Sequence, residues 1–210
     1  MSAALILTAA EARVVAALAE KSLTTPDYYP MTVNGLMAAA NQKTSRNPVM
    51  SLTEGEVGNA LITLEEKGLV SRDTSSSRAT KWRSRFMHQL LLKPATHAVL
   101  VTLMLRSAQT TAELRANAAP LNGPADLDGV QTALDDLADR ATPLVLTLPR
   151  SPGQSAVRHA HLLCGEPVLP VVEDSASAPR AASGSEARLA ALEARVAALE
   201  QKLAELGGAP

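Results

Sequence analysis

Six basic side chains in two short stretches of the sequence could together bind phosphate groups. Two lie in a loop at 42–50 and four lie between residues 78 and 85. Lysine and arginine bind the phosphate oxygens of nucleic acids, with an affinity that falls as salt rises. If the two stretches converge, all six share one edge. The alternative is an ordinary solvated strand face, and the pattern favours neither. The six residues are Lys43, Arg46, Arg78, Lys81, Arg83 and Arg85.

A second chemical signal is a pair of histidines on a strand predicted for residues 156–163. His159 and His161 share a face of that strand, a spacing that could hold a metal ion. A structural metal site needs about four ligands, yet Cys164 falls on the other face and Glu166 lies beyond the strand. We therefore expect no metal site and no cofactor. The sequence also shows no glycine-rich phosphate loop and no nucleophile elbow, so we expect that the protein is not an enzyme.

The elements that position the cations of residues 78–85 are a capped helix and a hairpin. Thr53 and Glu56 form a capping box, and Gly68 is the expected left-handed stop of the helix. A strand opens at residue 69, and the chain returns over residues 79–86. Side chains of a strand alternate between its two faces. The three cations at 81, 83 and 85 therefore point one way, opposite to Trp82, Ser84 and Phe86.

Two further helices precede this unit. Thr8 and Glu11 form another capping box, and the helix that follows carries a stripe of apolar residues. Thr32 can cap a second helix that ends near Asn41. The order helix, helix, helix, hairpin is that of a winged-helix domain, and we predict one at residues 1–92.

The same order of elements then repeats. An apolar helix is predicted for residues 94–106, Thr110 and Glu113 box the start of a second helix, and Asp126 can cap a third. Strands follow at 143–149 and 156–163. We therefore predict a mainly α fold with small β-hairpins (α+β), in which a second winged-helix domain occupies residues 93–165.

The C-terminal part changes character twice. Residues 166–185 are rich in Pro, Ala, Ser and Gly, which predicts a disordered linker. Residues 186–206 carry a heptad pattern that predicts a coiled-coil helix. Arginines at g and glutamates at e favour a parallel pairing, so we expect a homo-oligomer, most simply a dimer. The predicted seam consists of Leu189, Leu192, Val196, Leu199, Leu203 and Leu206.

Composition restricts the class of protein. The net charge is −1, so the whole-molecule field attracts neither nucleic acid nor membrane strongly. The longest apolar run, residues 98–105, is too short to span a bilayer. A single cysteine excludes an internal disulfide, and no signal peptide is evident. We expect a soluble, cytoplasmic protein without a membrane partner.

The loop Asn41–Met50 (NQKTSRNPVM) resembles the YceH-like family of bacterial tandem winged-helix proteins. Residues 7–16, 78–86 and 148–163 support the resemblance, which covers roughly residues 5–165. It implies the tandem winged-helix fold and carries no settled activity. Where that family tends to place a Tyr-Glu-His-Arg-Phe-like run, this chain has Trp82-Arg83-Ser84-Arg85-Phe86, which makes its hairpin more basic.

The third helix of each predicted domain bears on whether the protein binds DNA, because winged helices usually place this helix in the major groove. In the first domain Asn59 could pair with adenine, but four carboxylates oppose one lysine. Because this acidic helix suits the groove poorly, the leading hypothesis is a DNA-associated regulator that contacts phosphates mainly through the loop and the hairpin. The alternative is a protein-interaction scaffold whose partner surface is the acidic helix of the second domain, with Asp128, Asp135, Asp136 and Asp139.

Overall fold

Helices dominate the computed structural model, which describes residues 5–73, 79–150, 156–167 and 195. The chain divides into two compact units, residues 1–168 and 169–210. Several predictions fall outside the described residues: the cation Arg78, nearly all of the linker, and the coiled-coil seam. That seam consists of Leu189, Leu192, Val196, Leu199, Leu203 and Leu206.

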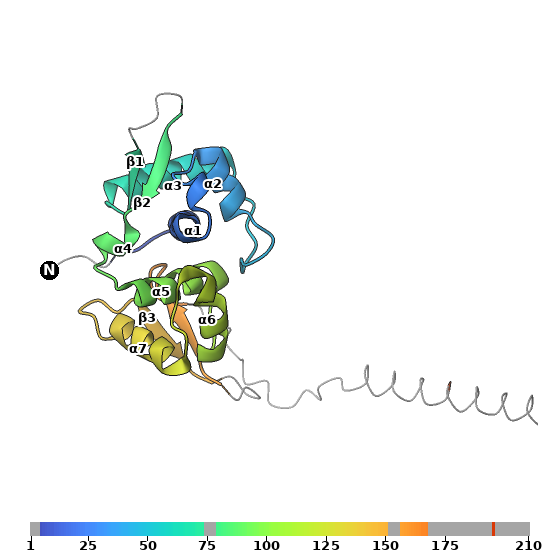
Figure 1. Ribbon diagram of the computed structural model, residues 1–210, viewed down its shortest axis with the longest axis vertical. Helices are drawn as coiled ribbons and strands as arrows, with labels where there is room; N and C mark the ends of the chain where they lie inside the picture. The colour runs from blue at the N-terminus through green and yellow to red at the C-terminus, as the bar shows by residue number, and fades with distance from the viewer. Residues whose placement is uncertain (1–4, 74–78, 151–155, 168–194, 196–210) are drawn as a thin grey trace, which may run out of the picture. The chain divides into compact units, whose positions relative to one another are not determined.

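In lobe 1, defined as residues 5–92, three α-helices precede the hairpin and the short helix α4 follows it (Figure 1). The two strands of the hairpin are antiparallel, with Val70 opposite Ser84 and Asp73 opposite Lys81. In chain order lobe 1 contains α1 (Ala9–Thr24), the 3-10 helix η1 (Pro26–Tyr28), α2 (Val33–Ala40), α3 (Glu54–Glu66), β1 (Val70–Asp73), β2 (Lys81–Ser84) and α4 (Phe86–Gln89).

Lobe 2, defined as residues 93–167, repeats that order of elements. Its hairpin is also antiparallel, with Val145 opposite His161 and Leu148 opposite Arg158. In chain order lobe 2 contains α5 (Pro94–Arg106), α6 (Thr111–Ala118), the 3-10 helix η2 (Ala119–Leu121), α7 (Leu127–Ala138), β3 (Val145–Leu148) and β4 (Arg158–His161). The described part of the protein is therefore a mixed α/β structure with two small antiparallel hairpins.

The helix starts lie where the capping residues predict them. Thr8, Thr53 and Thr110 each accept a hydrogen bond from the backbone N–H three residues on, and a glutamate completes each capping box. The side chains of Thr32 and Asp126 cap α2 and α7 in the same way, without the glutamate. Each such cap satisfies a backbone N–H that has no partner within the helix.

The hairpin of lobe 1 ends earlier than the sequence predicts. β2 stops at Ser84, and Phe86 begins α4, whereas the alternation of residues 79–86 indicated a strand through Phe86. The backbone leaves the strand conformation at Arg85, with φ −115° and ψ 5°. Phe86 is fully buried and its ring lies 6.0 Å from that of His97 on α5. The turn at Arg85 therefore places the chain's single phenylalanine in the core.

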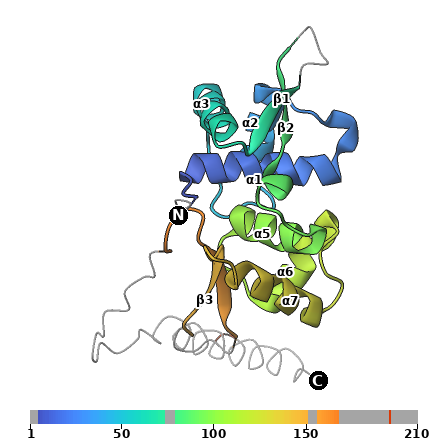
Figure 2. The same ribbon diagram turned by 90° about the vertical axis from the view of Figure 1, so that its left-hand side faces the viewer.

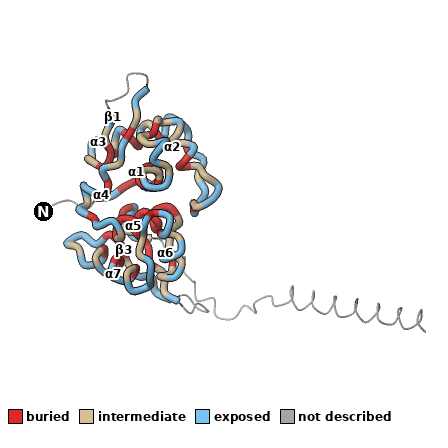
Figure 3. Tube along the Cα trace, in the orientation of Figure 1, coloured by how far each residue is buried: buried red, intermediate tan, exposed pale blue. Residues whose placement is uncertain are grey.

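Helices α1 and α5 lie at the centre of the first unit and contact each other (Figure 2). Every residue of α1 from Glu11 to Glu20 is buried, and so is every residue of α5 from Thr96 to Leu105 (Figure 3). A helix buried all round needs neighbours on all sides, and α1 has α2, α3 and β2 in lobe 1 in addition to α5. The lobes therefore share one continuous core, while the boundary proposed at residues 92–93 stays a prediction.

Burial of His97 should make folding sensitive to acid. Its pKa is lowered to about 4, first by burial and then by the nearby charge of His88. The unfolded chain, with a pKa of about 6.5, binds the proton more tightly than the folded chain. The stability that neutral His97 contributes is therefore fully present above about pH 6.5 and is lost as the pH falls towards 4. At ~1.4 kcal/mol per pKa unit, the expected loss from His97 is on the order of 3 kcal/mol. In urea unfolding at pH 7 and pH 4.5, the free energy of unfolding of His97→Leu should change less between the two pH values than that of the wild type. An equal change in both proteins would contradict the role of His97.

None of the helices in the described ranges is both long and apolar enough to cross a membrane.

Candidate nucleic-acid interface

Arg46, one of the six cations predicted to bind phosphate, is buried and already paired. Its side chain is fully covered, and Nη1 donates a hydrogen bond of 3.0 Å to Glu20 Oε1 on α1. Its Nε donates to the carbonyl oxygen of Ala39 at 3.2 Å. The prediction for Arg46 is therefore wrong, because this guanidinium holds the loop against α1 and α2 and is withdrawn from solvent.

A second buried arginine, Arg13 on α1, holds the far end of the same loop. Its Nη2 donates to the carbonyl oxygen of Pro48 at 2.8 Å and its Nη1 to that of Ala40 at 3.3 Å. Burial lowers the pKa of Arg13, and the neighbouring charge of Arg46 adds to the effect. Arg13 and Glu20 were not among the residues that the sequence suggested. The one available signal is that they interrupt the Ala- and Val-rich sequence of a helix.

The loop 41–50 also joins lobe 1 to lobe 2. The amide of Asn47 donates to the carbonyl oxygen of Leu105 at 2.9 Å, and Ser107 Oγ donates to the carbonyl oxygen of Asn47 at 2.7 Å. Arg106 Nη2 donates to Ser45 Oγ at 2.8 Å. The stretch that resembles a known family is therefore a strap between the lobes, and Lys43 is its exposed cation.

On the hairpin of lobe 1, the charge of Arg83 is partly compensated. Its Nη2 lies 3.1 Å from Asp73 Oδ2 on β1, and its guanidinium carbon lies 5.8 Å from the ring centroid of Tyr29. About half of the side chain remains exposed, so Arg83 still contributes positive potential, but less than an unpaired arginine. Lys81 has no ion pair to a described residue.

An open hollow of about 550 Å³, here called the α2 hollow, brings parts of the predicted set together. Thr32 and Gly35 at the start of α2 line it, together with Lys21 from α1 and Lys81 from β2. Gln42, next to Lys43 in the strap, also lines it, and so does one carboxylate, Asp27. The loop and the hairpin therefore do meet, around Lys81 and the strap, with Lys21 as a cation that the sequence did not suggest.

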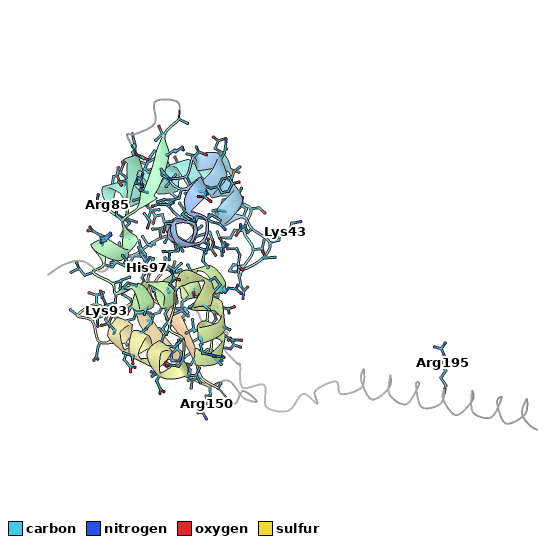
Figure 4. The ribbon with its side chains drawn as sticks, in the orientation of Figure 1. Lys43, Arg85, Lys93, His97, Arg150 and Arg195 are labelled. Carbon is cyan, nitrogen blue, oxygen red and sulfur yellow. The ribbon has the colours of Figure 1, made fainter. Side chains whose placement is uncertain are left out.

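The six cations do not share one edge. Figure 4 shows Lys43 and Arg85 on opposite sides of lobe 1, so they cannot contact one short phosphate run together. Arg46 is buried, and Arg78 lies outside the described residues. The expectation of a single six-cation edge is wrong for this reason. The set that the geometry leaves is Lys43 and Lys81, joined by Lys21, whose Nζ also lies 3.5 Å from Glu20 Oε2.

Helix α3 presents the acidic surface that its sequence predicts. Glu54, Glu56 and Glu66 are exposed on it, together with Asn59, and Ile62 is 48% exposed among them. Lys67, at the end of this helix, forms an ion pair with Glu11, with 2.8 Å between Nζ and Oε2. A phosphate backbone is repelled by such a face. Asn59 is exposed, so base contact by it stays a prediction, which its acidic surroundings disfavour.

The acidic residues of α7 lie in two environments. Asp128, Asp135 and Asp139 are exposed. Asp136 is different, because its Oδ2 accepts a hydrogen bond from Thr96 Oγ1 at 3.2 Å and its Oδ1 lies 3.7 Å from Lys93 Nζ. Asp136 therefore packs against α5 and does not belong to the exposed acidic face with the other three.

The histidines of β4 have structural surroundings. His159 Nδ1 lies 3.1 Å from Thr147 Oγ1 and Nε2 lies 3.4 Å from Thr111 Oγ1. Burial lowers the pKa of both histidines, that of His161 to about 4. No cluster of three potential metal-ligating side chains occurs within the described ranges.

Comparison with known proteins identifies the family. A family model described as "Protein of unknown function, DUF480" matches residues 7–154. The chain belongs to this family. A UPF0502 protein of Geobacter sulfurreducens is 44% identical over 172 residues, which are 82% of this chain and 78% of that protein. A UPF0502 protein of Citrobacter koseri is 44% identical over 193 residues, 89% of each chain. One from Acidovorax sp. is 45% identical over 188 residues, 88% of this chain and 83% of that protein.

The DUF480 match places the interface inside the family region. The matched residues 7–154 include nearly all of lobe 1, the strap, and lobe 2 through β3. The predicted coiled coil at 186–206 lies beyond the matched residues. The resemblance to YceH-like proteins is confirmed at the level of the family, and the names of these DUF480 relatives state no activity.

Proposed function

We propose that the protein is a tandem winged-helix protein that binds double-stranded DNA without catalysis, mainly through phosphates held at the α2 hollow. The order of helices and hairpin in each lobe supports the winged-helix assignment. The observation that carries the function is the meeting of Lys21, Lys81 and the first turn of α2 around one open hollow, with Lys43 beside it.

Parts of the α2 hollow suit an anion. The start of a helix lies at the positive end of a dipole that favours negative charge, although the Gly35 N–H of α2 is already donated to Thr32 Oγ1. Lysine supplies a compact charge for a phosphate oxygen. Asp27 lowers the net charge of the hollow, so binding should be modest and strongly dependent on salt. The carboxylates of α3 hold the helix that usually reads bases away from the groove, so little sequence preference is expected.

Replacing the three lysines should remove most of the DNA affinity. The variant Lys21→Ala, Lys43→Ala, Lys81→Ala should bind a random duplex at least about tenfold more weakly at low salt, because each lost phosphate contact returns its counterion to the DNA. Fluorescence anisotropy of a labelled duplex measures this directly.

The matched control is Arg85→Ala, Arg115→Ala, Arg150→Ala, which removes the same charge from exposed positions outside the hollow. It should retain most of the affinity. Equal losses in both variants would show that only net charge matters and would contradict the assignment to the α2 hollow.

We also propose that two copies pair in parallel through residues 186–206. A pair presents two α2 hollows to one duplex, and linked sites raise the effective concentration of the second contact. Protein that lacks residues 186–210 should therefore have the mass of a monomer by light scattering. A truncated protein that keeps the mass of the full-length oligomer would assign assembly to the lobes instead.

The second candidate function is a protein-interaction scaffold. We propose a cytoplasmic location for either function. The scaffold is favoured by the exposed face of α7, where Leu127 is 49% exposed beside Asp128. With Asp135 and Asp139, this face fits a basic partner that offers a small apolar contact. Folded protein that fails to bind any duplex at low salt would favour this function over DNA binding.

A further inference from the structure

A polar pocket lies where the strap meets lobe 2, separate from the α2 hollow. Its volume is about 220 Å³, and its walls come from the strap, the end of α5, α6 and the start of β4. A smaller cavity of about 80 Å³ shares Ser45, Arg106 and Asn117 with it. The side chains that matter below are Ser45, Arg106, Gln109, Glu113, Asn117 and Arg158.

The charges around this junction pocket leave one arginine uncompensated. Arg158 Nη1 lies 2.9 Å from Glu113 Oε2, and Arg46 is paired with Glu20. Arg106 forms no ion pair with any described residue, and the hydrogen bond found for its guanidinium is the one to Ser45 Oγ. A guanidinium carries five N–H donors in a planar fork. Most donors of Arg106 therefore remain for a ligand.

The amide side chains of the pocket are held in place before any ligand arrives. Asn117 Nδ2 donates to Gln109 Oε1 at 2.7 Å, and Gln109 Nε2 donates to the carbonyl oxygen of Thr102 at 3.2 Å. Gln109 is only 4% exposed. A ligand that enters the pocket therefore meets walls that need little ordering, which reduces the entropy lost on binding.

We propose that the junction pocket binds a small oxyanion, a carboxylate or a phosphate, through the guanidinium fork of Arg106. Planar bidentate recognition of such groups is the geometry for which arginine is best suited. Arg158, which also lines the pocket, adds positive potential although Glu113 is its partner. The volume is below the range of about 300–1,000 Å³ typical of drug-sized ligands, so the occupant is a phosphate ion or a carboxylic acid of a few carbon atoms.

An anion in this pocket contacts both lobes at once. Ser45 belongs to the strap of lobe 1, while Arg106 ends α5 and Asn117 lies on α6 of lobe 2. A ligand that binds only the folded chain raises its stability by mass action. The site does not depend on DNA binding, although the strap that it contacts also supplies Gln42 to the α2 hollow.

Thermal unfolding with two probes tests the proposal. Inorganic phosphate and malonate are titrated separately into the full chain, with chloride adjusted to keep the ionic strength constant. We expect a saturable rise in Tm with at least one probe, on the order of 3–5 °C at tenfold excess over its Kd. A response to phosphate alone or to malonate alone identifies which oxyanion the pocket prefers.

Four variants locate the bound probe. Arg106→Gln removes the fork, and Asn117→Leu fills the pocket without removing a cation, so each should abolish the Tm rise. Arg115→Gln, an exposed arginine of α6 outside the pocket, and the three-lysine variant of the α2 hollow should keep it. Should Arg106→Gln fail to fold, Asn117→Leu alone decides. The proposal is overturned if neither probe gives a saturable rise, or if the pocket variants respond like the wild type.

Discussion

Arg46→Met should lower the free energy of unfolding by about 3–5 kcal/mol, the range expected when one partner of a buried ion pair is removed. The Arg46 side chain is fully covered and that of Glu20 is 12% exposed. Without Arg46, the Glu20 carboxylate stays in the interior with only Lys21, at 3.5 Å, to compensate it. The carbonyl oxygen of Ala39 also loses two donors.

Urea unfolding measures this effect, with the linear dependence of free energy on denaturant. The double variant Glu20→Leu, Arg46→Met removes both charges and should be more stable than Arg46→Met alone. Arg83→Met is the comparison variant, because its arginine is 48% exposed whereas the Arg46 side chain is fully covered, and it should cost about 1 kcal/mol or less. A loss at Arg46 no larger than at Arg83 would contradict the account of a buried ion pair between Arg46 and Glu20.

Phe86→Ala should lower the free energy of unfolding by about 3–5 kcal/mol. Phe86 is fully buried, and its ring is tilted by 53° to that of His97 on the neighbouring lobe. Truncation leaves a cavity where the hairpin of lobe 1 passes into α4 and on to α5. Phe86→Leu retains most of the volume and should cost less than about 1.5 kcal/mol.

The control for this prediction is Leu91→Ala, five residues further along the chain, where the side chain is 85% exposed. Surface changes of this kind usually stay within about 0.5 kcal/mol. A loss below about 1 kcal/mol for Phe86→Ala would mean that the contact between the lobes contributes little, and that the two predicted domains are nearly independent.

Local signals in the sequence predicted the helix starts well. A threonine with a glutamate three residues later fixes a helix start through two hydrogen bonds, and both partners lie within one helical turn of the sequence. Gly68 likewise marks the end of α3, because its φ of 71° is one that glycine adopts without strain. These features need no information from elsewhere in the chain.

The burial of Arg46 could not be predicted in this way. Its partner Glu20 is 26 residues away, and only the packing of the strap against α1 brings them together. Pattern analysis assigns an arginine in a polar loop to solvent, since arginine is rarely buried without a partner. Lys21 was missed for the same reason. It lines the α2 hollow together with Lys81 only because β2 packs against α1.

One signal in the sequence did point to the contact between the lobes. The segment Ala98–Leu105 is apolar at nearly every position, whereas a surface helix alternates apolar and polar faces. A helix that is apolar all round is buried on all sides, and α5 is. The apolar run was long enough to indicate a central helix, but the sequence does not say which element covers it.

The salt dependence of duplex binding can show whether lobe 1 binds DNA phosphates at the α2 hollow, as we propose. Affinity of the wild type for a random duplex is measured from about 25 to 200 mM salt, beside the three-lysine variant. With a contribution of about −0.9 per neutralised phosphate, the wild-type slope of log K against log salt should be steeper by roughly 2 to 3 units. Equal slopes in the two proteins, or no binding by folded wild type at the lowest salt, would contradict the account.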